Sequence, residues 1–475
     1  MKIICRTTLA AALAAVLTTF AGRLPAQAPP AGAAEIKELR TFYFGNSLME
    51  NTMVGLHGRL GASAGKTWDL RGALIHPGVP IWVHAVRQDE PDSLNHKKFY
   101  AEGPRTDAIV MLLFAGSGLS FTTGEMWGKE RFDPPRDVGD VASCAGIIQH
   151  YLKLNPQGKA YVYAPWGFGF TELREVKERI KKEAEEALRA QGAERGEILK
   201  KVKERKPTDA EMDPIRKSSD YAASYLTKDY IPEVPSVEVK ERYRKYVGVV
   251  GKPAGKSKGK APAPAAAAFP ATLSALAEAA GVSVEQVRAD FALIRLQEKD
   301  LGAPDISDRI SRYVWGQPFT HSRAHAWAVL EGLKAKFPDL WKQGRLGMIP
   351  VGDVFLAVDQ QIKAGKVPGL VNVGEFSTDG THIRSGLPRY TVAATFYAVL
   401  FKEHPGKLDW KIYADRANYE NKENLAQGKL NMIGGHYVHV PDLGTHVEIT
   451  EERAQVINDT IWEVVTKHPY TKVDQ

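Results

Sequence analysis

Hydrophobic and polar positions along the chain follow two alternating periods, one typical of strands and one of helices. Four short apolar runs end in Gly, Pro or Trp, as buried parallel strands do. The expected strands are residues 39–44, 107–114, 159–166 and 345–352. The expected helices, with apolar residues at helical spacing, are residues 49–65, 138–154, 322–337, 351–365, 388–403 and 450–468. This order of strands and helices predicts an α/β fold with a mostly parallel sheet.

The alternation is interrupted between about residues 168 and 317. Residues 172–205 are highly charged with little apolar stripe, which is typical of a solvated helical arm. Residues 251–272 are rich in Lys, Pro, Ala and Gly, and this composition favours a flexible tether. Residues 272–297 return to an amphipathic pattern, which we interpret as a helical hairpin rather than a DNA-reading helix-turn-helix. The expected units are a core domain in two parts, 35–167 and 318–470, and a helical insertion, 168–317, that could dock a protein partner.

The N-terminus has the pattern of a secretory signal peptide. Lys2 and Arg6 precede an apolar run over residues 7–22, and Ala26-Gln27-Ala28 then provides a small-residue cleavage site. The run is short for a membrane span, so we expect residues 1–28 to be removed, with an uncleaved anchor as the alternative. The sequence therefore predicts a periplasmic or secreted protein without a stable membrane span.

Composition and charge narrow the class of protein. The chain has 475 residues, of which 44% are hydrophobic and 25% charged, so it is neither collagen-like nor mostly disordered. Three of the seven net positive charges lie in the leader and four in the tether, which leaves the remainder neutral. We therefore expect no nucleic-acid partner. The mature chain would keep only Cys144, which we interpret as a buried helix residue.

The first motif with chemical content is Gly45-Asn46-Ser47-Leu48, where an expected strand ends and a helix begins. A serine there stands at the carboxyl edge of the sheet, where open α/β sheets bind ligands. A helix N-terminus at this place would favour developing negative charge. The alternative is that Ser47 only caps the helix.

The second motif, Asp379-Gly380-Thr381-His382, favours a nucleophilic serine. Serine is a weak nucleophile that needs a base within hydrogen-bond reach, and that base needs a partner that fixes its orientation. An Asp and a His three residues apart in one loop can supply both groups. Ser47, His382 and Asp379 are therefore the expected nucleophile, base and orienting carboxylate.

With these two blocks the sequence resembles the GDSL/SGNH hydrolase family. The resemblance covers about residues 39–166 and 318–465, and it implies a flavodoxin-like three-layer α/β/α sandwich interrupted by the insertion. It also implies a serine esterase that cleaves acyl esters, with O-acetyl groups on carbohydrates as the expected substrates. The alternative is an inactive protein on the same fold that binds a glycan or cell-wall ligand.

The expected oxyanion hole combines the N–H groups of Ser47 and Gly78 with residues Gly116 and Ser117. The family places an Asn in the last block, but Gly118 stands in that position here. Losing one oxyanion donor can cost about 10²–10³ in turnover. Three explanations stay open: another group such as Ser117 substitutes, this branch of the family lacks the block, or the enzyme is weak or inactive.

Other residues give weaker signals. Trp82 and Trp166 are expected near strand ends, where aromatic rings could stack on sugars. The His321 and His325 pair has a zinc-ligand spacing but lacks the glutamate that usually accompanies it, so we interpret both as helix-surface histidines. His446, with two neighbouring histidines, completes no familiar ligand set. We expect no metal and no cofactor, because phosphate-binding glycine loops are also absent from the sequence.

Overall fold

The computed structural model describes a defined set of residues in the chain. These are residues 35–75, 81–86, 105–113, 139–167, 171–192, 194, 198, 201, 208–226, 239, 242–243, 270–291, 296–301, 322–420 and 446–473. The expected signal peptide and nearly all of the expected tether lie outside the described residues. So do Gly78, Gly116, Ser117 and Gly118, which the sequence assigned to or near the oxyanion hole.

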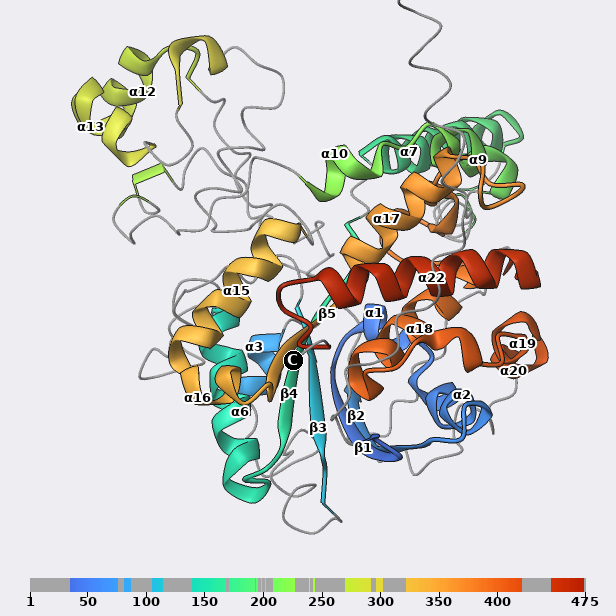
Figure 1. Cartoon of the computed structure of the whole chain (residues 1–475). Helices are drawn as coiled ribbons and strands as arrows, with labels where there is room; N and C mark the ends of the chain where they lie inside the picture. Colours follow the sequence, from blue (N-terminus) through green and yellow to red (C-terminus); the bar gives the residue numbers. More distant parts are fainter. Residues whose placement is uncertain are drawn as a thin grey trace, which may run out of the picture. The chain divides into compact units, whose positions relative to one another are not determined.

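A five-stranded parallel sheet forms the centre of the fold (Figure 1). Its strands are β1 (Glu38–Gly45), β2 (Thr67–Ile75), β3 (Ala108–Leu112), β4 (Lys159–Ala164) and β5 (Leu346–Pro350). They lie in the order β2-β1-β3-β4-β5, and every neighbouring pair is parallel. The predicted α/β class with a mostly parallel sheet is therefore confirmed, and four of the strands lie where the apolar runs placed them.

Side chains alternate between the two faces of the sheet, and each face has its own hydrophobic core. In β1, Tyr43 points to one core while Phe42 and Phe44 point to the other. Five of the helices that cover the Tyr43 core are drawn to the right of and above the sheet in Figure 1. They are α1 (Ser47–Glu50), α2 (His57–Ser63), α17 (Val351–Lys363), α18 (Leu387–Phe401) and α22 (Glu451–Lys467).

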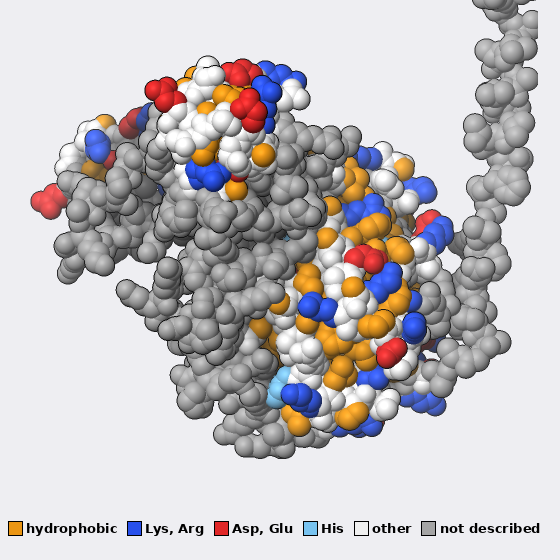
Figure 2. Space-filling view, turned by 90° about the vertical axis from the view of Figure 1, so that its left-hand side faces the viewer, with side chains coloured by type: hydrophobic (Ala, Val, Ile, Leu, Met, Phe, Trp, Pro, Cys, Tyr) orange, Lys and Arg blue, Asp and Glu red, His pale blue; other side chains and the backbone are white. Residues whose placement is uncertain are grey.

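The opposite core lies beneath α3 (Ile81–Val86), α6 (Asp140–Leu154), α15 (Arg323–Lys336) and α16 (Pro338–Lys342). Cys144 of α6 is fully buried there, as its sequence context predicted. Figure 2 views the molecule from this side. Among the described residues of that face, Lys, Arg, Asp and Glu side chains lie interspersed with hydrophobic ones.

The region expected to be an insertion contains helices with two kinds of surroundings. Helix α7 (Thr171–Ala190) carries exposed ion pairs, whereas α10 (Tyr221–Tyr225) joins the Tyr43 core, in which Tyr221 and Tyr225 are buried. Helix α9 (Asp209–Lys217) buries Met212 and Arg216 outside that core. Helices α12 (Leu273–Ala280) and α13 (Val284–Asp290) meet at a turn within the helical hairpin expected over residues 272–297, and they enclose a small core of their own. The charged region thus includes residues that help build the main hydrophobic core.

Shorter elements complete the described chain. They are η1 (Val54–Leu56), η4 (Glu298–Asp300), η5 (Val373–Phe376), β6 (Ser385–Gly386), η6 (Pro405–Lys407), α19 (Lys411–Ala414), α20 (Ala417–Glu420) and β7 (His446–Val447). Strands β6 and β7 form a separate parallel pair. A search of the described helices finds none with the length and apolarity needed to span a bilayer.

Two local expectations differ from the structure. Strand β2 is an edge strand in which Trp68 and Leu70 alternate with polar residues before Gly72, so it lacks the short apolar run by which the other strands were predicted. The helix expected over 49–65 is broken, because Met53 adopts a left-handed conformation with φ of 56°. Non-glycine residues rarely take such angles, and the chain turns there before helix resumes.

Candidate active site

The turn that follows β1 places Ser47 at the carboxyl edge of the sheet. A Cβ atom on Gly45 would lie 2.7 Å from the Cβ of Met49, so only glycine fits this close approach. The Asn46 side-chain oxygen accepts a hydrogen bond from the N–H of Leu48 at 2.9 Å. Asn46 is therefore the cap of α1, and Ser47 is the first helical residue. The alternative interpretation of Ser47 as the cap is wrong, and its hydroxyl is available for other contacts.

Ser47, His382 and Asp379 form a continuous hydrogen-bonded chain. The Ser47 Oγ lies 3.0 Å from Nε2 of His382. On the other side of the imidazole, Nδ1 lies 3.1 Å from Oδ2 and 3.2 Å from Oδ1 of Asp379. Ser47 is 335 residues from His382 in sequence, so folding alone brings the two motifs together. The three residues meet in the order that a serine nucleophile, its base and an orienting carboxylate require.

The loop from Thr378 to His382 is shaped by its own hydrogen bonds. Oδ1 of Asp379 accepts the N–H groups of Thr381 at 3.0 Å and of His382 at 2.8 Å. Gly380 has a φ of 89°, which glycine adopts without strain, and its N–H donates to the Ser377 hydroxyl. These bonds explain the spacing of the D-x-x-H motif, because the carboxylate holds the backbone of the turn as well as the imidazole.

Contacts from distant parts of the chain then fix this loop in place. The indole N–H of Trp166, after β4, donates to the Thr381 carbonyl at 2.7 Å. The Asn51 side-chain oxygen, just after α1, accepts the N–H of Ile383 at 3.0 Å. Asn51 lies four residues after Ser47, so one short stretch of chain carries the serine and also anchors the loop beyond the histidine.

A third anchor comes from α9, inside the expected insertion. The Arg216 side chain is 2% exposed, and its Nη2 donates to the Thr378 carbonyl at 2.9 Å. Its Nη1 binds Asp209 and Asp213, each at 2.8 Å. The two carboxylates balance the buried charge and orient the guanidinium toward the loop. The region that the sequence separated from the core thus contacts the residue immediately before Asp379.

The backbone next to the Ser47 hydroxyl includes one group that acyl transfer would need. The backbone N–H of Ser47 has no hydrogen-bond acceptor in the described part of the chain, and such a group can stabilise an oxyanion beside the serine. The other residues assigned to the oxyanion hole lie outside the described set. Their roles, and the consequence of Gly118, stay predictions.

The two tryptophans expected to bind substrate occupy other places. Trp166 is 1% exposed, stacks on Phe355 and holds the Thr381 carbonyl, so its ring has no free face for a sugar. Trp82 on α3 is also buried, at 3% exposure. The expectation of aromatic platforms at these positions is therefore wrong, because both side chains pack inside the fold. Trp166 is instead a positioning residue for the loop that carries His382.

The histidines considered as metal ligands have other partners where the structure describes them. His325 is buried and its Nε2 lies 2.8 Å from Oδ2 of Asp140, which makes a link between α15 and α6 rather than the expected surface histidine. The Nδ1 of His446 lies 3.2 Å from the Ser385 hydroxyl. Within the described ranges, no group of three metal-binding side chains gathers. His321 falls outside those ranges.

Glu50 was not singled out in the sequence, although it lies three residues after Ser47. Its side chain is buried, and desolvation raises its pKa to about 8, while the charge of Arg389 acts in the opposite direction. The carboxyl is therefore largely protonated at neutral pH. Only the three-residue spacing from Ser47 could have drawn attention to it, whereas nothing in the sequence indicated Arg216.

Comparison with known protein-family models, curated proteins and solved structures finds no match for this chain.

Proposed function

We propose that this protein is a serine ester hydrolase of the SGNH type. The observation that carries the proposal is the chain of contacts from Ser47 through His382 to Asp379, with the serine oxygen 3.0 Å from the imidazole. A histidine so placed can take the serine proton, and the carboxylate stabilises the imidazolium that results. The family's two motifs supply these same three residues.

The reaction follows from this geometry. The Ser47 oxygen attacks the ester carbonyl while His382 takes its proton, and the Ser47 N–H stabilises the oxyanion. The intermediate collapses, the alcohol leaves with the proton from His382, and an acyl-serine remains. Water then attacks the acyl group with His382 again as base, which releases the acid and restores the serine.

We also propose a flavodoxin-like fold, a substrate class and export, as the family resemblance and the leader sequence suggest. The strand order β2-β1-β3-β4-β5 is that of flavodoxin-like sheets, and Ser47 follows the strand at which that order reverses, where such sheets bind ligands. We propose acyl esters as the substrate class, with carbohydrate O-acetyl groups as the first to test. Export to the periplasm or the exterior is proposed from the leader sequence.

The direct test is hydrolysis of p-nitrophenyl acetate by the purified mature chain, with Ser47→Ala and Ser218→Ala compared in parallel. Ser218 is an exposed serine on the end of α9, so its variant controls for the substitution itself. We expect Ser47→Ala to reduce kcat/KM by about 10⁴ or more and Ser218→Ala to leave it unchanged. Equal rates for wild type and Ser47→Ala would overturn the proposed nucleophile. No hydrolysis by wild type, together with a glycan-induced rise in Tm, would favour the binding-protein alternative.

A further inference from the structure

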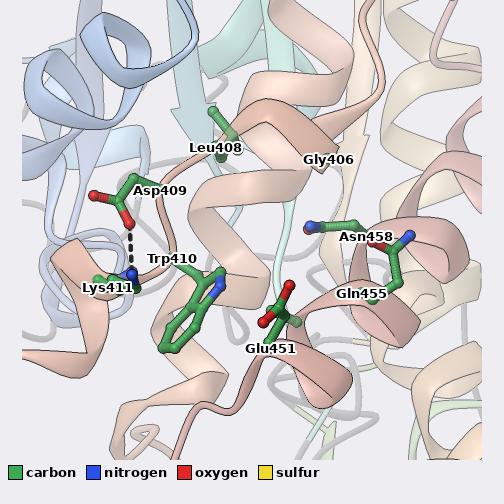
Figure 3. Close-up of a pocket in the computed structure, with 9 residues that line it drawn as sticks. Gly406, Leu408, Asp409, Trp410, Lys411, Glu451, Gln455 and Asn458 are labelled. Carbon is green, nitrogen blue, oxygen red and sulfur yellow. Dashed lines mark hydrogen bonds between the residues drawn. The ribbon is translucent and has the colours of Figure 1, made fainter.

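A pocket of about 260 Å³ is lined by none of the three proposed catalytic residues (Figure 3). One wall comes from the chain between η6 and α19, and the other from the first half of α22. The buried side chains of Leu408 and Ala454 supply apolar lining. The remaining side chains are mostly polar, so the pocket combines a small apolar surface with several hydrogen-bonding groups.

Asn458 on α22 is the most informative of these groups. It is 4% exposed, and its Oδ1 accepts a hydrogen bond from the buried Tyr390 hydroxyl at 2.8 Å. That bond fixes the orientation of the amide, whose Nδ2 has no partner among the described residues. Figure 3 shows this side chain pointing into the pocket. The residue is largely buried, but its Nδ2 reaches the open pocket, so Asn458 presents a pre-oriented donor to whatever occupies that space.

Trp410 and Glu451 add complementary groups. The Trp410 ring is half-buried, and neither its indole N–H nor the Glu451 carboxylate has a hydrogen-bond partner in the described chain. Figure 3 shows both side chains pointing toward the same space as Asn458. The pocket therefore offers two donors and one carboxylate acceptor around an aromatic ring.

The charges in the lining narrow the ligand class. The lining holds two carboxylates, Asp409 and Glu451, and one lysine. The backbone N–H of Lys411 donates to Asp409 at 3.1 Å, and its ammonium lies 5.9 Å from the centre of the Trp410 ring. An anionic ligand would meet two carboxylates, so anions are disfavoured. A ligand with an apolar ring face and hydroxyl groups that both donate and accept would match the ring, the amide and the carboxylate together.

We propose that this pocket binds one ring of a neutral saccharide, independently of the chemistry at Ser47. The Trp410 ring would cover the apolar face of the sugar. Glu451 would accept from its hydroxyl groups, and the Asn458 amide and Trp410 N–H would donate to them. Binding here would hold a glycan on the protein whether or not Ser47 hydrolyses an ester.

The test is calorimetric titration of the mature chain with xylotetraose, cellotetraose, mannotetraose and chitotetraose. Each is added up to about 10 mM, so that a Kd as weak as about 1 mM is still detected. Glu451→Gln and Glu463→Gln form a matched pair, because both residues are exposed on α22 and only Glu451 lines the pocket. We expect at least one tetrasaccharide to bind wild type and Glu463→Gln equally. Glu451→Gln should bind it about tenfold more weakly.

Two further variants separate the ring from the amide. Trp410→Ala should abolish measurable binding, whereas Asn458→Asp, which keeps the acceptor for Tyr390 and removes the donor, should weaken it about tenfold. All four variants are compared with Ser47→Ala, which should bind as wild type does. The proposal is overturned if no tetrasaccharide binds, or if binding survives Trp410→Ala and Glu451→Gln. It is also overturned if the same titration with the cation spermidine shows binding while the saccharides do not bind.

Discussion

The nucleophile and the base of the proposed site are held by different kinds of structure. Ser47 follows directly from β1, an interior strand of the sheet, and its turn is fixed by Gly45 and Asn46 next to it in sequence. His382 lies in a loop whose anchors come from three distant segments. Local packing thus determines the position of the serine, whereas long-range hydrogen bonds determine the position of the histidine.

This difference predicts where the site is vulnerable. Disturbing the serine side requires a change in the sheet or its core, which would also affect the stability of the whole fold. Disturbing the histidine side requires only the loss of one anchor, which can misplace the imidazole while the core stays intact. Activity and stability should therefore separate on the histidine side and fall together on the serine side.

The largest effect is expected from removing the base itself. His382→Ala should reduce kcat/KM for p-nitrophenyl acetate by about 10⁴, because the serine would lose its only base. His404→Ala is the matched control, since His404 pairs with Asp459 away from the triad and should leave the rate unchanged. A loss of less than tenfold in His382→Ala would show that this histidine does not activate Ser47.

The next effect tests the anchor from α9. Arg216→Ala removes the donor to the Thr378 carbonyl, and a small displacement of the loop should lower kcat by about 10–100-fold with little change in KM. Arg179→Ala on α7 removes an exposed arginine of the same insertion and should have no effect. Arg216→Lys should restore part of the rate. An unchanged kcat in folded Arg216→Ala would break the proposed link between the insertion and the base.

On the serine side, His57 predicts a pH dependence of stability. Its ring is fully buried, contacts the Tyr43 hydroxyl of β1 at 3.1 Å, and burial lowers its pKa to about 3. The folded state therefore holds the neutral form, whereas the unfolded chain binds a proton below pH 6.5. The stability contributed by His57 is present above pH 6.5 and is lost as the pH falls toward 3.

Between pH 7 and pH 5 this amounts to about 2 kcal/mol of unfolding free energy. Urea unfolding at several pH values should show that His57→Gln lowers stability at pH 7 but flattens the acid decline by that amount. Parallel pH curves for wild type and variant would contradict the buried neutral state of His57.

The smallest effect is expected from removing the indole N–H of Trp166. Trp166→Phe keeps a ring against Phe355 but leaves the Thr381 carbonyl without its donor. We expect a loss of about 1 kcal/mol in unfolding free energy and a several-fold fall in kcat. A fall in stability alone, with kcat unchanged, would mean that Trp166 supports the core and does not position the loop.

The same contrast explains what the sequence could predict. Ser47, His382 and Asp379 could be predicted because each lies in a short motif whose spacing follows from local hydrogen bonds, as in the Asp379 turn. Four strands and most core helices could be predicted because the spacing of apolar residues indicates which face of each element is buried. Strand β2 was missed because, at the edge of the sheet, it alternates apolar and polar residues and contains a glycine, and so has no short apolar run like those of the other strands.

The anchors of the loop could not be predicted in this way. Arg216 and Thr378 are 162 residues apart, and Trp166 and Thr381 are 215 apart, so no local pattern records either contact. The sequence instead presented Trp166 as a sugar platform and α9 as part of a solvated insertion. Only the fold shows that both contact the proposed base loop.

Whether His382 activates Ser47 as a nucleophile is tested most directly by covalent labelling of the mature chain with a fluorophosphonate, followed by peptide mass mapping. An activated serine displaces fluoride from this reagent, so we expect a single adduct on Ser47. Labelling should be absent in Ser47→Ala and strongly slowed in His382→Ala. If Ser47 stays unlabelled in the folded wild-type protein, it is not an activated nucleophile. If Ser47 is labelled equally in wild type and His382→Ala, then His382 does not activate it.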